Sequence, residues 1–386
     1  MRQHARLMAA AGNTVRIVAG RGQVVDAGVE FTGLPLADSR NSEVLAAKSE
    51  LDAGRVPPAF EMLVQRIENE LRPLLVGADW VICHNVCSLN KNLSLTAALY
   101  RVSESRRPPR LILWHHDLAW AAPRYRNELH AGFPWSLLRS DWPEASQVVV
   151  SAQRQAELAR LLEVRTDRIR VIPNGIDVAQ FLALSAPTQV LVREFRLLDA
   201  APLMLLPVRI TPRKNIELAL EVLSILRIRL PDARLVVTGP VGPHNPANAQ
   251  YFQRLLVLRG DLNLEDAALF LTQAAGRSLP DEVVADLYRL ADLLLLPSLE
   301  EGFGLPILEA GLAGIPVFCS NIESLKQLGR GQLTYFDAEG DAASVAGQIA
   351  AALERSPRFA LRHRVLREHT WEHIYAEHLA PLLEGR

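Results

Sequence analysis

The sequence lacks an excess of charge of either sign and a long apolar run. Its 386 residues carry a formal net charge of -1, so no strong basic field indicates a nucleic-acid partner. No run approaches the ~20 apolar residues that span a bilayer, so we expect peripheral membrane contact at most. Gly12 and Asn13 interrupt the first apolar patch, and a signal peptide needs an apolar core of ~7–15 residues. These features predict a cytoplasmic protein.

Cysteine is scarce, which limits both disulfide and zinc chemistry. The three residues are Cys83, Cys87 and Cys319. Their number is odd and their spacings fit no common zinc pattern. We expect reduced thiols and no metal site; Cys83 and Cys87 as metal ligands is the less favoured alternative.

Short β-branched runs alternate with helical patterns in both halves of the chain. The strand-like runs are 14–20, 29–35, 79–85, 110–117 and 147–152, and then 202–210, 233–240, 267–273, 292–298 and 316–320. Helical patterns lie near 58–76, 90–104, 214–230, 246–262, 280–290 and 305–314, and another begins after a capping Ser151. The stretch 169–177 closes the first half with a turn, and the pattern then weakens between the halves.

This alternation predicts an α/β protein with two doubly wound, Rossmann-like domains. We expect a first domain at 1–180, a second at 181–370, and a helix at 371–386 that packs back on the first domain. Continuously apolar runs such as "DLLLLPS" are typical of parallel strands that are covered on both faces.

Two glutamates flank a glycine turn in "LPSLEEGFGLPILEAGLAGIP". Pro306 suits the first turn of a helix, which leaves Glu301 in the loop and Glu309 about one turn inside the helix. Gly302 and Gly304 let a ligand approach the backbone, and the helix start attracts phosphate oxygens. Carboxylates accept hydrogen bonds from sugar hydroxyls, so the layout suits a nucleotide sugar. A plain glycine turn with two solvated acids is the alternative.

Basic residues follow another predicted strand. "PVRITPRKN" places Arg209 and Lys214 where open α/β sheets bind their ligands, and both charges would suit a diphosphate. Gly239, in "VVTGP", ends a further predicted strand and is a weaker candidate. A solvated loop is the alternative for the basic pair.

Three motifs occur in this order along the chain: "VIPNGID" at 171–177, Arg209 and Lys214 in "RITPRKN", and Glu301 and Glu309 separated by seven residues. With these motifs the chain resembles a retaining glycosyltransferase of family 4. The resemblance covers nearly the whole chain. It implies the GT-B fold, in which two Rossmann-like domains face a cleft, and transfer of a hexosyl group with retention from a UDP- or GDP-linked sugar to an unidentified hydroxyl acceptor.

The resemblance also implies roles for single residues. Glu309 would accept hydrogen bonds from the ribose, and Arg209 and Lys214 would bind the diphosphate. Glu301, together with Gly302, Phe303, Gly304 and Leu305, would hold the donor sugar and the phosphates. The nucleotide sugar is a substrate, so no cofactor is implied. No metal is implied either, in agreement with the absence of an Asp-x-Asp pair.

The first half offers candidates at two predicted strand ends. "LILWHHD" ends in His115, His116 and Asp117, and the resemblance implies a histidine here that faces the donor. Alternate side chains along a strand point to opposite faces, so only one of the two histidines can face the donor. We favour His116, because it immediately precedes Asp117 as in the family's His-Asp pair, and we expect His115 to be packed.

Residues at the end of the neighbouring strand and in the loop 120–135 each have two possible roles. His84, Asn85 and Asn90 would either line the acceptor site or cap a helix that begins at Leu89. The aromatic and basic loop 120–135 is an ordered loop or an acceptor wall, and the nucleotide base would contact the backbone near 270–273.

Three other functions are alternatives to a glycosyltransferase. A nucleotide-sugar epimerase would share the donor site, and a donor-binding protein would lack turnover. A dehydrogenase is disfavoured because no Gly-x-Gly-x-x-Gly follows a first strand.

The beginning of the chain also departs from the family pattern. The family's first strand and its glycine-rich turn are absent before Arg2. We expect a truncated start with flanking strands left unpaired and weak activity, or direct pairing of 14–20 with 79–85.

Overall fold

The computed structural model divides the chain into two compact units. The first comprises Met1–Ile176 and Trp371–Arg386, and the second comprises Asp177–Thr370. The structure describes residues 1–23, 26–105, 108–242, 245–271 and 278–385. Among these residues, no helix combines the length and apolar character needed to cross a membrane. Each unit is built on parallel sheets, which confirms the α/β class.

The first unit contains two separate parallel sheets. Strands β1 and β2 form one, and β3, β4, β5 and β6 form the other in that order. No ladder joins β1 to β3 among the described strands, so the direct pairing of 14–20 with 79–85 is not observed. The elements are α1 (Arg2–Ala10), β1 (Val15–Ala19), β2 (Val29–Gly33), α2 (Ser42–Asp52), α3 (Ala59–Leu75), β3 (Trp80–His84), α4 (Leu93–Ser103), β4 (Arg110–His115), β5 (Ser146–Val149), α5 (Ala152–Leu162) and β6 (Ile169–Val171).

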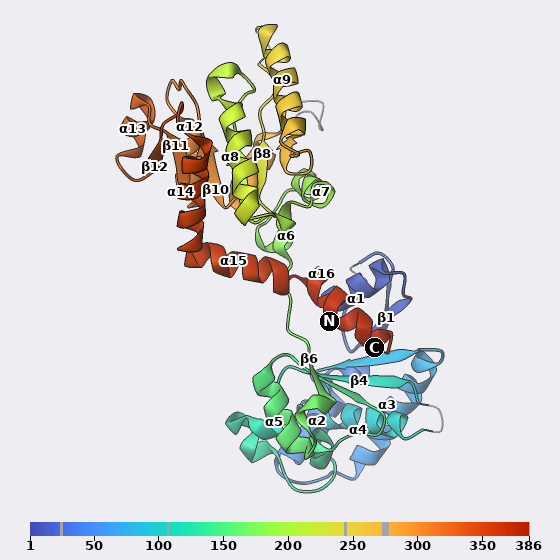
Figure 1. Ribbon diagram of the computed structural model, residues 1–386. Helices are drawn as coiled ribbons and strands as arrows, with labels where there is room; N and C mark the ends of the chain where they lie inside the picture. The colour runs from blue at the N-terminus through green and yellow to red at the C-terminus, as the bar shows by residue number, and fades with distance from the viewer. Residues whose placement is uncertain (24–25, 106–107, 243–244, 272–277, 386) are drawn as a thin grey trace. The chain divides into compact units, whose positions relative to one another are not determined.

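The C-terminal segment packs on the sheet of the first unit. It consists of α16 (Trp371–Ile374), a π-helical turn (Tyr375–Leu379) and α17 (Ala380–Leu383). Its apolar residues share a core with Ile112 and Trp114 of β4. The Trp80 indole donates to the Leu383 carbonyl at 2.9 Å. Helices α1 and α16 lie side by side, joined by an ion pair between Arg6 and Glu372 (Figure 1).

The second unit is a six-stranded parallel sheet in the order β12-β11-β10-β7-β8-β9. Helices α8 and α14 pack together, and α12 packs on α11 and β10. The elements are α6 (Val178–Phe181), α7 (Ala186–Glu194), β7 (Leu203–Leu206), α8 (Ile216–Arg229), β8 (Arg234–Val237), α9 (Ala247–Asp261), β9 (Ala268–Phe270), α11 (Asp281–Leu290), β10 (Leu293–Leu296), α12 (Leu305–Ala313), β11 (Val317–Ser320), α13 (Glu323–Gly329), β12 (Thr334–Phe336), α14 (Ala342–Glu354) and α15 (Pro357–Glu368).

Several expectations from sequence agree with the structure and others need correction. All four leucines of β10 are fully buried, as the apolar run predicted, and Ser151 caps α5 by accepting from the Arg154 N–H. The weakly patterned stretch after Asp177 forms α6 and α7, and 169–171 is a strand as well as the start of a turn. Helix α4 begins at Leu93 with Asn92 as its cap, not at Leu89.

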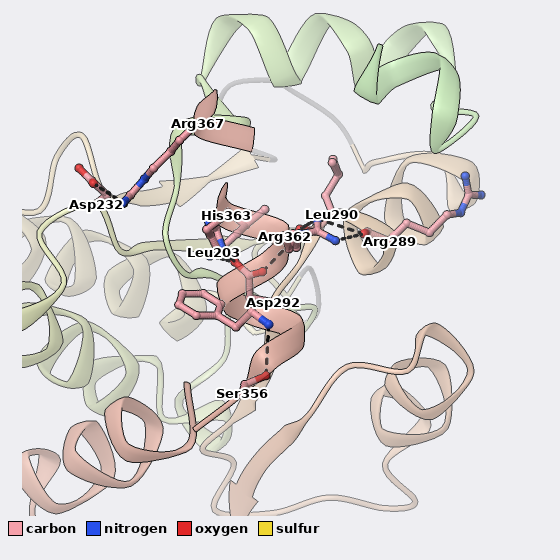
Figure 2. A network of polar contacts seen from close by, with 10 residues as sticks. Leu203, Asp232, Arg289, Leu290, Asp292, Ser356, Arg362, His363 and Arg367 are labelled. Carbon is pink, nitrogen blue, oxygen red and sulfur yellow. Dashed lines mark hydrogen bonds and ion pairs between the residues drawn. The ribbon is translucent and has the colours of Figure 1, made fainter. Parts of the chain in front are cut away.

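A buried carboxylate fixes the amino ends of β7 and β10. Asp292, which precedes β10, accepts from the Leu203 N–H of β7 at 2.8 Å and lies 3.0 Å from the His363 ring. Arg362 approaches it at 3.4 Å and donates to the Leu290 carbonyl at 2.6 Å. Figure 2 shows these groups converging on Asp292, the two basic ones from α15. Asp292 therefore ties α15 to the middle of the sheet.

We expect Asp292→Ala to destabilise the second unit by about 3–5 kcal/mol, because it leaves the partly buried Arg362, the buried His363 and the Leu203 N–H without their carboxylate. Asp232→Ala is the matched control: Asp232 pairs with Arg367 in the same region, but both side chains are more than half exposed. That pair contributes ~0.2–1 kcal/mol. Chemical denaturation followed by circular dichroism measures both losses. Equal losses for the two variants would contradict the assignment.

Two buried histidines, His4 and His115, and the partly buried His84 lie in the first unit. The His4 ring packs 4.5 Å from the Trp114 ring and 5.2 Å from the His84 ring. His115 is bonded to Gln147 at 2.9 Å. Burial is the main cause that lowers the pKa of His4 to about 3, of His84 to about 2 and of His115 to about 4. The folded unit therefore holds all three rings neutral.

We expect the first unit to lose stability as pH falls below 6.5. Each histidine has a lower pKa folded than unfolded, so the unfolded chain takes up protons first and the stability present above pH 6.5 is lost toward the folded pKa. At pH 5 the loss is about 2 kcal/mol for each histidine. All six tryptophans belong to this unit, so tryptophan fluorescence reports its unfolding alone. His4→Phe should show a smaller pH dependence, and unfolding that does not change between pH 7.5 and 5 would refute this account.

Candidate functional site

The candidate site lies where the connections of the second sheet change direction. From the centre of the sheet, the strands follow in the order β7, β8, β9 toward one edge and β10, β11, β12 toward the other. We call the position between β7 and β10 the switch point. The change falls between β7 and β10, which are paired in parallel. Open α/β sheets bind ligands at the carboxyl ends of the strands beside such a point. The two segments that follow β7 and β10 carry Arg209, Lys214 and Glu301.

A buried ion pair joins these two segments. Lys214 Nζ contacts Glu301 Oε1, and each side chain is only 9% exposed. Ser298 donates to the same carboxylate oxygen at 2.8 Å. The Leu299 N–H donates to the Arg213 carbonyl at 2.8 Å. Burial lowers the pKa of Lys214, and the Glu301 carboxylate opposes that effect. The pair therefore fixes one loop against the other.

Helix α12 presents an uncapped N-terminus beside this pair. Gly304 begins the helix at φ 95°, in the left-handed region, and no side chain caps it. Pro306 lies in its first turn, as predicted. A side chain at Gly302 would meet nothing within 4 Å, so this part of the turn is open to a ligand. Phe303 and Leu305 are exposed on either side of Gly304. Free N–H groups and the helix dipole make such an end a site for phosphate oxygens.

Glu309 lies one turn into α12 and has a partner that sequence reasoning missed. The Tyr288 hydroxyl of α11 donates to Glu309 Oε2 at 2.6 Å. Glu309 is exposed, whereas Tyr288 is buried. Nothing in the spacing of the sequence connects these two residues, because their contact depends on how α11 packs against α12.

Arg209 and Gly239 differ in what they offer a ligand. Arg209 is exposed and makes no hydrogen bond or ion pair among the described residues, so its charge is available. The structure explains why position 239 is a glycine: a Cβ there would lie 2.0 Å from the Val208 carbonyl oxygen. The glycine is needed by the close packing of two backbone segments, whatever its role toward a ligand.

In the first unit, the chain after β4 is tied to the end of β3. The Asn85 side chain accepts from the N–H groups of His116 and Asp117 at 3.0 and 3.1 Å. Asp117 pairs with Arg124 at 3.5 Å. His115 is buried, as expected of the packed histidine, while His116 is only partly buried. Burial lowers the pKa of His116, and Asp117 opposes the shift.

The helix-capping alternative for His84, Asn85 and Asn90 is not what the structure shows. His84 packs against the rings of His4 and Trp114, and Asn90 donates to Glu128 at 2.7 Å. The loop 120–135 is ordered by side-chain contacts such as the bond from Trp120 to the Trp135 carbonyl. Of the expected base contact near 270–273, Phe270 and Leu271 are buried and 272–273 lie outside the described residues.

Among the described residues of the second unit, the exposed Arg209, the open start of α12 and the carboxylates of Glu301 and Glu309 lie beside the point where the connections change direction. This set can bind an anion between groups that accept hydrogen bonds from hydroxyls. Within the described ranges, no three His, Cys, Asp or Glu side chains are grouped so as to hold a metal ion.

Comparison with protein families matches both parts of the chain. Residues 1–180 match the family described as Glycosyltransferase Family 4. Residues 192–367 match the family described as Glycosyl transferases group 1. The second match contains Arg209, Lys214 and both glutamates of the candidate site.

Named relatives are similar at low identity. The D-inositol 3-phosphate glycosyltransferase of Saccharomonospora viridis is 29% identical over 197 residues, which cover 47% of this chain and 41% of that protein. The glycogen synthase of Mycobacterium tuberculosis is 27% identical over 315 residues, covering 78% and 67%. The chain spans less than half the length of the D-inositol 3-phosphate glycosyltransferases that it matches.

Among solved structures, a glycosyltransferase from Rickettsia africae is 16% identical, with 100% of this chain and 93% of that chain covered and a TM-score of 0.39. The Anabaena protein HepE in complex with UDP-glucose is 18% identical, with 88% and 89% covered and a TM-score of 0.39.

We expect the Lys214–Glu301 pair to behave as one unit in stability measurements. Glu301→Ala leaves Lys214 buried without a counter-charge and should cost about 3–5 kcal/mol. The double variant Lys214→Met with Glu301→Gln removes both charges and should lose less than the sum of the single changes. Arg209→Ala is the control, since an exposed residue without partners changes stability by about 0.5 kcal/mol or less. Losses that simply add would show that the two side chains are not coupled.

Proposed function

Because the chain belongs to the family 4, group 1 glycosyltransferases, we propose that it transfers a hexosyl group from a nucleoside-diphosphate sugar to a hydroxyl acceptor, with retention. The observation that carries the proposal is the position of the segment from Glu301 to Glu309, in which the two acids flank the glycine turn. It follows β10 at the switch point and faces the segment that follows β7, to which Lys214 and Glu301 bind it.

The donor fits this arrangement group by group. The diphosphate would bind the open N-terminus of α12 and the Arg209 guanidinium, which is charged and unpaired among the described residues. Glu309 would accept from the ribose hydroxyls. Glu301 would orient the donor sugar, with Lys214 and Ser298 holding its carboxylate in place. UDP is the first nucleotide to test, because HepE of Anabaena was solved with UDP-glucose.

Lys214 has a restricted role in this proposal. Its ammonium group is buried and already paired with Glu301. Lys214 therefore holds the two loops together and is not a free cation for the diphosphate. Charge that develops on the departing diphosphate is then met mainly by Arg209 and the helix end. His116, with Asp117 and Asn85 beside it, is the residue that we propose for the acceptor side of the reaction.

We expect a nucleoside diphosphate to raise the melting temperature of the second unit. A ligand at ~100 times its dissociation constant adds about 2.7 kcal/mol. Binding should weaken by roughly 1.5–3 kcal/mol in Glu309→Ala and in Arg209→Ala, the range for hydrogen bonds to a charged group. Thermal shift with UDP and GDP, followed by calorimetry on both variants, measures this.

Arg229→Ala serves as the control variant. Arg229 is an exposed arginine at the far end of α8, paired with Glu354, and its loss should leave nucleotide affinity unchanged. Unchanged affinity in Glu309→Ala would overturn the ribose role of that residue. A search by mass spectrometry for a new glycoside separates the transferase from an epimerase, which gives an isomerised donor, and from a binding protein, which gives neither.

A further inference from the structure

Tyr288 lies beside the donor site without reaching the solvent. It belongs to α11, it is 4% exposed, and its ring is part of the core of the second unit. Its hydroxyl lies 2.6 Å from Glu309 Oε2 and 3.5 Å from the Pro306 carbonyl oxygen, both on the first turns of α12. The single polar atom of this buried side chain is thus directed at the acid of the candidate site.

The single hydroxyl hydrogen must go mainly to Glu309. A phenol carries one hydrogen, and an O–H bond to a carboxylate has its normal length at 2.5–2.7 Å, whereas 3.5 Å to a carbonyl is at the limit of a bond. Burial raises the pKa of Tyr288, and the hydrogen bond and charge of Glu309 raise it further. The hydroxyl therefore stays protonated and remains a donor.

The bond occupies only one of the two carboxylate oxygens. Glu309 Oε1 has no partner among the described residues. A helical side chain is directed back toward the N-terminus of its helix, which for Glu309 means toward the turn at Gly304. With Oε2 held by Tyr288, Oε1 is the oxygen left for a ligand at that turn.

An exposed glutamate that is not held would sample several rotamers, and binding would have to order it. Glu309 is exposed, and the Tyr288 hydroxyl is the one contact that restrains its carboxylate within the described part of the chain. We propose that Tyr288 is a positioning residue that orients Glu309 toward the ribose hydroxyls of the donor, an inference that rests on the proposed function.

This role predicts a particular kinetic change. A hydrogen bond to the ribose is distant from the bond that breaks, so it acts equally in the ground state and in the transition state. Losing its pre-organisation raises KM and leaves kcat unchanged. A structural role of Tyr288 in packing α11 against α12 would instead lower the melting temperature and alter both constants.

The test compares Tyr288→Phe with the unchanged chain, using UDP and 2′,3′-dideoxy-UDP as probes in calorimetry. Phenylalanine keeps the ring and removes only the hydroxyl. We expect UDP to bind about tenfold more weakly to the variant, and the dideoxy nucleotide to bind both proteins equally, because it offers no hydroxyl for Glu309 to accept from. Tyr288→Phe added to Glu309→Ala should have no further effect.

Tyr335→Phe is the matched control. The Tyr335 hydroxyl is buried in the same unit and has no partner among the described residues, so its loss should leave UDP affinity unchanged. The inference is overturned if Tyr288→Phe binds UDP as well as the unchanged chain does, or if it weakens UDP and the dideoxy nucleotide equally. The inference is also overturned if the unchanged chain binds UDP and the dideoxy form alike, because Glu309 then has no role toward the ribose. The proposed function fails separately if the unchanged chain binds no nucleoside diphosphate.

Discussion

The buried contact between Lys214 and Glu301 is the interaction on which the candidate site depends. Two loops leave neighbouring strands here, and besides this ion pair they are joined by the bond from the Leu299 N–H to the Arg213 carbonyl. A pair with both side chains 9% exposed is costly to bury and costly to break. Once it forms, the turn at Gly302, the start of α12 and the loop with Arg209 take fixed positions relative to one another.

A second polar contact acts at the opposite ends of the same strands. Asp292 binds the Leu203 N–H and approaches Arg362 and His363, so it ties the starts of β7 and β10 to α15. The strand pair at the switch point is therefore fixed at its amino ends by one buried carboxylate and at its carboxyl ends by another. Between them the four leucines of β10 are fully buried. A rigid strand pair of this kind keeps a binding site in place at little entropic cost on binding.

Much of the architecture follows from local sequence patterns. Apolar runs predict most of the strands, and Pro306 predicts the start of α12. That start places Glu301 in the loop and Glu309 in the helix. These features depend on neighbouring residues, which a sequence displays directly. Strand β12 and the helices α2, α13, α14 and α15 were not predicted; β12 is short, and α2 lacks a strong apolar period.

What the sequence did not show was how distant side chains meet. Tyr288 reaches Glu309 only because α11 packs against α12, and Asp292 meets His363 across 71 positions of the chain. The sequence places Gly239 at a strand end, but it does not show the close approach of the Val208 carbonyl at that position. Asn92, and not a residue near Leu89, caps α4. Partners of this kind are set by tertiary packing, so spacing alone cannot identify them.

Hydrogen–deuterium exchange with and without saturating UDP tests the central claim most directly, namely that the switch point between β7 and β10 binds a nucleoside diphosphate. Slower exchange should appear in 208–216 and 297–309, the segments that follow these two strands, because bound phosphates would occupy the N–H groups of the turn and of the helix start. Protection confined to other segments, or no change at a nucleotide concentration that saturates binding, would contradict the account.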